Sequence, residues 1–123
     1  GPIVAITGPP GIGKSCLIDK ILYELTPELV VGVLAVDPTS PVSGGALLGD
    51  RIRFNVLDDA NKAESIYIRS IATRSSGGSI PSIVNDLASH LLANDFDLVI
   101  IETVGAGQSE MRCAAVADRI IVV

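Results

Sequence analysis

Residues 8–15 read GPPGIGKS and lie between a short apolar run, residues 3–6, and a segment with helical spacing. At ordinary amino-acid frequencies the spacing G-x-x-x-x-G-K-[ST] arises rarely by chance in a chain of this length. The three glycines lack a Cβ atom, so the backbone can curl around an anion with its N–H groups pointing inward. This stretch therefore predicts a strand, then a phosphate-binding loop, then a helix.

The two residues that close the motif have separate expected roles. Lys14 would reach the β- and γ-phosphates of a nucleotide as a point charge, and the hydroxyl of Ser15 would be a ligand of Mg²⁺. The amino end of a helix that begins near Lys14 would add its positive dipole end. The alternative is a glycine-rich turn with an exposed lysine. In that case the lysine and the hydroxyl would occur at these two positions only by chance.

Apolar runs and helical patterns alternate along the rest of the chain. The expected strands are 3–7, 29–36, 65–68, 98–101 and 119–123, and helices are expected at 14–25, 48–57 and 111–117. A further helix has its apolar stripe over 83–92, with Ser79 as a possible cap and Pro81 in its first turn. Strands that alternate with helices favour right-handed crossovers and a mostly parallel sheet with helices on both faces. With the glycine-rich loop, this predicts the three-layer α/β fold of P-loop nucleoside triphosphatases.

Length and composition fit one domain with a core of aliphatic side chains. The chain has 123 residues, of which 48% are hydrophobic and only 3% aromatic. Parallel strands covered by helices are typically built from Ile, Val, Leu and Ala in this way. The last residues, 120–123, resemble a central strand with nothing after it. We therefore expect residues 1–123 to be a single core domain that is truncated after its fifth strand.

Charge and cysteine content exclude several function classes. The net charge is -5 and no Lys/Arg cluster occurs, which disfavours binding to nucleic acid or anionic membranes. No leader segment and no apolar run approaching about 18 residues is present, which favours the cytoplasm. The two cysteines and one histidine do not support a zinc site or a disulfide, and Cys16 and Cys113 are expected to be small buried residues.

Two carboxylates follow apolar runs and are candidates for the acidic element beside a bound magnesium ion. Asp37 ends one run, and Glu102 ends another and begins E-x-x-G with Gly105. The carboxyl ends of parallel strands border the ligand crevice, so both carboxylates are expected to face the phosphates. E-x-x-G resembles the D-x-x-G switch of GTP-binding proteins, whose glycine N–H binds the γ-phosphate. Asp37 could instead cap a turn before Pro38, and Glu102 could be a plain strand-end charge.

Three longer stretches make the resemblance specific. They are AVDPTSPVSGGALLGDRIR (35–53), IRSIATRSSGG (68–78) and ETVGAGQSE (102–110). Together with the loop they resemble the MeaB/ArgK family of P-loop GTPases. These proteins are chaperones of adenosylcobalamin-dependent methylmalonyl-CoA mutase and were once described as kinases of an amino-acid transport system. The resemblance covers nearly the whole chain and implies GTP or GDP, Mg²⁺, a cobalamin-dependent mutase partner and a homodimer of the full-length protein.

The resemblance also implies roles for individual residues. The nucleotide would be bound by Pro10, Gly11, Ile12, Gly13, Lys14, Ser15 and Cys16. The metal would be held, directly or through water, by Ser15, Asp37, Asp50 and Glu102, and the residues assigned to catalysis are Lys14, Asp50, Glu102 and Gly105. Asp50 could instead cap a helix that holds Arg51 and Arg53. Gln108 is not expected to position the attacking water, because it lies three residues beyond Gly105.

The segment that would select the base is absent. Guanine is normally chosen by N-K-x-D after the strand that ends this chain, and NKAE at 61–64 is expected to be only a solvated loop. Guanine specificity and dimerisation therefore rest on the resemblance. The favoured function is the GTP-binding and GTP-hydrolysing core of a chaperone for a cobalamin-dependent acyl-CoA mutase. The alternatives are an ATP-dependent kinase linked to amino-acid transport and a metallochaperone GTPase, which would need Cys or His ligands beside the nucleotide.

Overall fold

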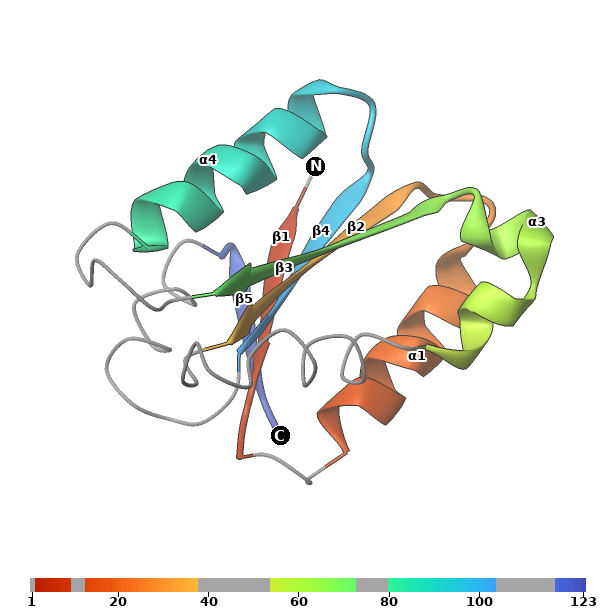
Figure 1. The fold of residues 1–123 in the computed structure, drawn as a ribbon, viewed down its shortest axis with the longest axis horizontal. Helices are drawn as coiled ribbons and strands as arrows, with labels where there is room; N and C mark the ends of the chain where they lie inside the picture. Colours follow the sequence, from red (N-terminus) through yellow and green to blue (C-terminus); the bar gives the residue numbers. More distant parts are fainter. Residues whose placement is uncertain (1, 10–12, 38–53, 73–79, 104–116) are drawn as a thin grey trace.

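The chain forms a parallel sheet with helices on both faces, as predicted. The computed structural model describes residues 2–9, 13–37, 54–72, 80–103 and 117–123. The strands are β1 (Ile3–Thr7), β2 (Val31–Asp37), β3 (Ile66–Ala72), β4 (Leu98–Thr103) and β5 (Arg119–Val122). They pair in the order β3-β2-β4-β1-β5, and every pair is parallel (Figure 1).

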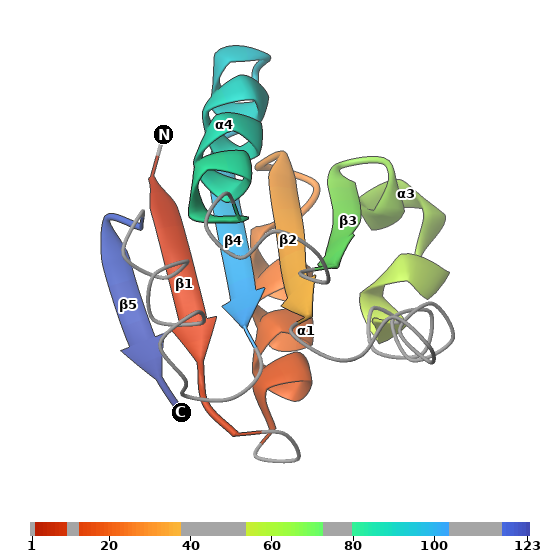
Figure 2. The same cartoon turned by 60° about the vertical axis from the view of Figure 1, so that its left-hand side comes forward.

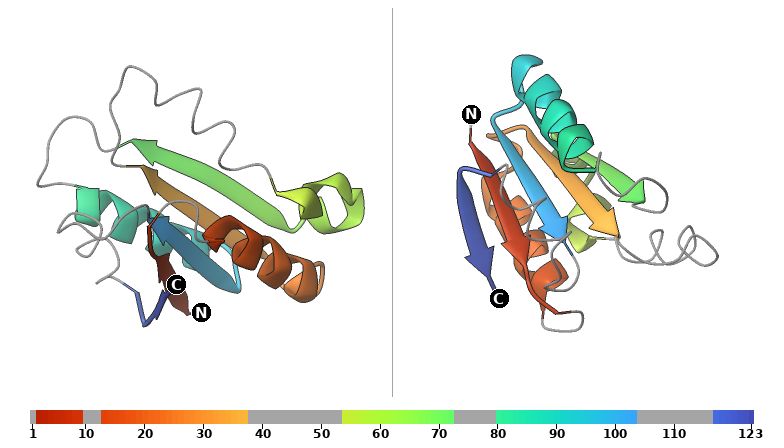
Figure 3. Two further views of the ribbon diagram at one scale, coloured as in Figure 1. Left: turned by 90° about the horizontal axis from the view of Figure 1, so that it is seen from below. Right: turned by 90° about the vertical axis from the view of Figure 1, so that its left-hand side faces the viewer.

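Helices cover the two faces of the sheet. Helix α1 (Lys14–Leu25) lies on one face with the short helices η1 (Asn55–Asp58) and α3 (Ala60–Ala63), and α4 (Ile80–Ala93) lies on the other (Figures 2 and 3). Helical spacing predicted α1 with the bounds that the structure shows. Helix α4 begins at Ile80, so Pro81 stands in its first turn, where the lack of an N–H group does no harm.

Side chains alternate between the two faces along each strand, which divides the core into two apolar layers. Along β2, Val31 and Val33 pack on the α1 side, whereas Leu34 and Val36 pack on the α4 side. The α1 layer contains Ile6, Ile18, Leu22, Val31, Val33, Phe54, Val56 and Ile100. The α4 layer contains Ile3, Ala5, Leu34, Val36, Ile71, Val84, Ala88, Leu91, Val99 and Ile101. The strands can therefore be apolar throughout because both faces are covered.

The strand order brings the glycine-rich loop and Glu102 to one place. The chain passes from β1 to β2 and leaves a position that β4 later fills, so β4 lies between them. In this register Glu102 pairs with Ile6 of β1 on one side and with Ala35 of β2 on the other. All the strands end at the same edge, and β1 turns there toward the start of α1 (Figure 2). Ligands of open parallel sheets bind at such an edge.

The structure differs from the sequence-based expectations at several elements. Strand β3 is longer than predicted, and β4 runs to Thr103, so Glu102 lies inside the strand and not after it. Residues 119–122 form the fifth strand, as predicted, and this strand pairs with β1 within the described sheet. The apolar side chains of this strand are exposed among the described residues. The expected helix 48–57 is described only in part, as the 3-10 helix η1, and 111–116 lies outside the described residues.

Gly32 of β2 lies close against the side chains of Leu91 and Phe96. A Cβ atom at Gly32 would lie 2.8 Å from Cδ1 of Leu91 and 3.5 Å from Cδ2 of Phe96. We expect Gly32→Val to lower the free energy of unfolding by about 1–3 kcal/mol, because overpacking outweighs the better strand propensity of valine. Urea denaturation measures the effect. Gly32→Ala should cost less, since the Leu91 methyl can turn away, and a Gly32→Val protein as stable as the parent would contradict the packing.

Candidate functional site

The glycine-rich loop joins β1 to α1 through unusual backbone angles. Gly8 follows β1 with φ 150°, and Gly13 precedes α1 with φ 96° and ψ 14°, in the left-handed region. A Cβ atom on Gly13 would meet nothing within 4 Å. Glycine is therefore needed at this position for its backbone conformation and not for space.

Lys14 is buried at the start of α1 and points back into the loop. Its side chain is only 4% exposed, and Nζ donates hydrogen bonds to the carbonyl oxygens of Gly8 (2.7 Å) and Pro9 (2.8 Å). Burying an ammonium group is costly unless hydrogen bonds compensate it, and these two bonds do so. The alternative of an exposed lysine in a glycine-rich turn is therefore wrong.

The amino end of α1 also favours a negative ligand. Gly13 carries no capping side chain, and the first intrahelical bond runs from the Leu17 N–H to the Gly13 carbonyl. The first N–H groups of a helix have no acceptor within it, and they carry the positive end of the helix dipole. The first turn of α1 thus places N–H groups that lack a helical acceptor beside a buried cation, which is the chemistry that binds phosphate.

Glu102 is the buried carboxylate beside this loop. It is 1% exposed and lies on the α1 face of β4, two residues after Ile100, which packs in the α1 layer. The hydroxyl of Ser15, in the first turn of α1, donates a hydrogen bond to Glu102 Oε2 at 3.4 Å. A hydroxyl and a carboxylate are oxygen ligands of the kind that Mg²⁺ prefers, so this pair fits a divalent cation.

The other predicted site residues are described only in part. Asp37 is the last residue of β2, and its backbone pairs with Ala72 at the edge where Glu102 also lies. Pro10, Gly11, Ile12, Asp50 and Gly105 lie outside the described residues, as do Gln108, Arg51 and Cys113. Their roles, like those of the described residues, stay predictions.

Cys16 is exposed, so the prediction that it is a small buried residue is wrong. Ile18 and Leu22 mark the buried side of α1. Cys16 lies two residues before Ile18, which is more than half a helical turn and therefore on the opposite side of the helix. The backbone N–H of Cys16 is still one of the first-turn N–H groups of α1 that can donate to a ligand.

The NKAE segment is not a solvated loop. Asn61 and Lys62 belong to α3, and Lys62 Nζ donates hydrogen bonds to the carbonyl oxygens of Tyr23 (2.9 Å) and Thr26. The same ammonium lies 4.6 Å from the centre of the Tyr23 ring. Lys62 therefore caps the carboxyl end of α1, where the helix dipole is negative.

Removing this cap should lower the stability of the fold without changing the candidate phosphate site. We expect Lys62→Met to lower the free energy of unfolding by about 1 kcal/mol, because the cap and the cation–π contact are lost while the apolar stem is kept. Thermal and urea denaturation measure the loss. Lys20→Met, on the exposed side of α1, is the control and should change stability little; equal losses in the two variants would show that the cap is unimportant.

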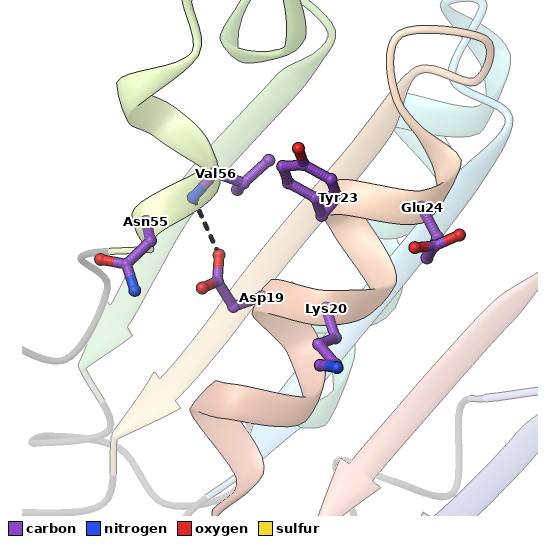
Figure 4. Close-up of a pocket in the computed structure, with 6 residues that line it drawn as sticks. All are labelled: Asp19, Lys20, Tyr23, Glu24, Asn55 and Val56. Atoms are coloured by element: carbon purple, nitrogen blue, oxygen red, sulfur yellow. Dashed lines mark hydrogen bonds between the residues drawn. The ribbon is translucent and has the colours of Figure 1, made fainter.

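A shallow hollow of about 380 Å³ lies between α1 and η1 (Figure 4). It is lined by Asp19, Lys20, Tyr23, Glu24, Asn55 and Val56. Within it, Asp19 Oδ1 accepts a hydrogen bond of 2.9 Å from the Val56 N–H, and Phe54, the residue before η1, offers no capping side chain. Asp19 therefore caps η1 from α1. The sequence alone does not reveal this contact, because it joins two segments far apart in the chain.

Comparison with known proteins agrees with this geometry. The signal recognition particle receptor FtsY of Elizabethkingia anophelis superposes with a TM-score of 0.62 over 94% of this chain and 36% of its own, at 22% identity, which shows a shared fold. The family model for the methylmalonyl-CoA mutase-associated GTPase MeaB matches residues 2–123. This chain belongs to the MeaB family. The resemblance predicted from the four sequence stretches is thus confirmed, and MeaB proteins are GTPases.

Individual relatives support the same membership. A Pyrococcus horikoshii protein named as a candidate GTPase is 49% identical over 98% of this MeaB-family chain and 38% of its own length. The fused isobutyryl-CoA mutase of Geobacillus kaustophilus is 42% identical over 95% of the chain and 11% of its own length. The chain thus spans well under half of these relatives. Among the described helices of the MeaB-family chain, none is long and apolar enough to cross a membrane.

Proposed function

We propose that this chain is the GTP-binding and GTP-hydrolysing core of a chaperone that serves a cobalamin-dependent acyl-CoA mutase. The observation that carries the proposal is the arrangement at the carboxyl edge of β1 and β4. There, a buried lysine, the amino end of α1 and the contact between Ser15 and Glu102 come together. Membership of a family of mutase-associated GTPases and a relative fused to a mutase support the partner.

The phosphate half of the site would use groups that already converge. Lys14 is a buried point charge that donates to Gly8 and Pro9, and the same ammonium can turn its hydrogen bonds to phosphate oxygens. N–H groups of the loop and of the first turn of α1 would bind the remaining oxygens. Because phosphoryl transfer involves little covalent work by the protein, such positioning and charge neutralisation account for most of the catalysis.

The metal half would be built on Ser15 and Glu102. Their oxygens would hold Mg²⁺, with Asp37 and Asp50 as further proposed ligands, directly or through water. The ion, when bound, neutralises charge on the phosphates. Glu102 is buried on β4, which lies between β1 and β2, so its backbone is held in place by the sheet and not by a surface loop. A fixed backbone at this position favours one arrangement of the metal and the phosphates.

Several finer points belong to the same proposal. Guanine is favoured as the base by the family and by an FtsY structure of Elizabethkingia anophelis solved in complex with GDP. We propose that residues 1–123 are one GTPase core, that the full-length protein is a cytoplasmic homodimer, and that Gly105 senses the γ-phosphate. Turnover is expected to be slow without the mutase, since no strong general base is evident among the candidate residues.

Calorimetric titration of the full-length protein with GDP and with ADP, each in Mg²⁺, tests the choice of base. GDP should bind at least about tenfold more tightly, a difference of about 1.4 kcal/mol. Equal affinities would contradict guanine specificity. Release of free phosphate from GTP, accelerated by the mutase, is expected in a parallel assay. Transfer of the phosphate to a protein or small acceptor, with no free phosphate released, would instead support the kinase alternative.

A further inference from the structure

The α1 face of the sheet changes from apolar to polar one row before the site edge. In the parallel register the rows across β4, β2 and β3 are Leu98–Val31–Ile66, then Ile100–Val33–Ile68, then Glu102–Ala35–Ser70. The first two rows pack in or against the α1 layer. Paired residues of parallel strands point to the same face, so Glu102, Ala35 and Ser70 share the face on which Ser15 contacts Glu102.

The hydroxyl of Ser70 is buried, and it has no hydrogen-bond partner among the residues that the structure describes. A buried hydroxyl without a partner costs about 1–3 kcal/mol, so an acceptor, a donor or a water molecule is expected beside it. The two preceding rows on this face contain only apolar residues, as expected where the side chains serve packing alone. A serine at this row therefore points to a polar neighbour.

Ala35 leaves room between the two polar residues. It is fully buried, and its methyl group is the smallest side chain that has a Cβ atom. The backbones of β3 and β4 lie two strand spacings apart, about 10 Å, and Glu102 and Ser70 lie on the same face of the sheet on either side of Ala35. One water molecule can bridge two polar atoms through two hydrogen bonds of about 2.8 Å each, and such a bridge would satisfy the Ser70 hydroxyl.

We propose that Ser70 is a positioning residue of the metal half of the site. Its hydroxyl holds a water molecule over Ala35, and this water donates to the Glu102 carboxylate and fixes the orientation in which Glu102 meets the cation. The inference rests on the proposed function, because it assigns Ser70 to the metal site of that GTPase. Groups that orient a metal ligand in this way typically change metal affinity by about 10–100-fold when they are removed.

The test is Mn²⁺ binding to the full-length protein loaded with GDP, followed by electron paramagnetic resonance of free Mn²⁺. Ser70→Ala should weaken Mn²⁺ binding by about tenfold. GDP affinity at saturating metal and the unfolding temperature should stay close to those of the parent. Ser70→Thr keeps the hydroxyl and should restore most of the affinity, whereas Ser70→Cys keeps the volume without a strong donor and should not.

Ser65→Ala is the matched control, since Ser65 lies at the opposite end of β3 and its hydroxyl contacts the Pro27 carbonyl at 3.5 Å. It should leave Mn²⁺ binding unchanged. Mn²⁺ affinity of Ser70→Ala within twofold of the parent, or equal losses in the Thr and Ala variants, would overturn the proposal. If Ser70→Ala left Mn²⁺ affinity unchanged while GDP still bound, only this inference would fail. If the parent protein did not bind GDP at all, the proposed function itself would fail.

Discussion

Lys14→Ala should reduce the affinity for GDP in Mg²⁺ by about 100-fold or more. The buried ammonium already donates two short hydrogen bonds inside the loop, and a phosphate would receive these charge-assisted bonds. Hydrogen bonds to charged groups contribute about 1.5–3 kcal/mol each, and about 2.7 kcal/mol corresponds to two powers of ten in affinity. Calorimetry of the full-length variant with GDP and Mg²⁺ measures the loss.

Two matched variants show whether GDP affinity depends on the position of the Lys14 ammonium or only on the presence of a positive charge. Lys20→Ala removes an exposed lysine from the same helix and should leave GDP affinity unchanged. Lys14→Arg keeps the charge, but its larger planar group does not fit between the Gly8 and Pro9 carbonyls in the same way, so we expect it to bind GDP poorly. Lys14→Ala protein that is folded and binds GDP as tightly as the parent would contradict the phosphate-binding role of the loop.

Glu102→Gln should raise the Mg²⁺ concentration needed for half-maximal GTP hydrolysis by about 10–100-fold. The amide keeps the shape of the carboxylate but removes the negative charge that faces Ser15 on the α1 side of the sheet. A neutral oxygen attracts a divalent cation less strongly, above all at a buried position where water does not screen the charge. Phosphate release measured over a series of Mg²⁺ concentrations gives the shift.

The control for Glu102 is an exposed carboxylate on α1, the helix that covers the same face of the sheet. Glu24→Gln, on the exposed side of α1, should leave the Mg²⁺ dependence unchanged. GDP affinity without added metal should change little in Glu102→Gln, which would separate metal binding from phosphate binding. An unchanged Mg²⁺ dependence in Glu102→Gln would show that Glu102 has no part in binding the metal.

The sequence predicted the parts of the site that depend on local order. Glycine spacing, the position of Lys14 and the apolar periodicity of α1 together predicted a strand, a loop and a helix. The apolar run before Glu102 predicted a strand that ends near the site. These features depend on a few consecutive residues, whose conformational preferences are similar in most folds.

What the sequence did not predict depends on the strand order. The row that places Ser70 two strands from Glu102 exists only because β2 lies between β3 and β4. Likewise Lys62 caps α1 only because α3 folds against its carboxyl end, and residues 61–64 alone look like a polar loop.

A crystal structure of the full-length protein with GDP and Mg²⁺ tests the central claim most directly. We expect Nζ of Lys14 to lie within hydrogen-bond distance of the β-phosphate, and we expect Ser15 Oγ to be a ligand of the cation on the side that faces Glu102. A diphosphate bound elsewhere, such as in the hollow beside Tyr23, with Lys14 still donating only to the Gly8 and Pro9 carbonyls, would contradict the account.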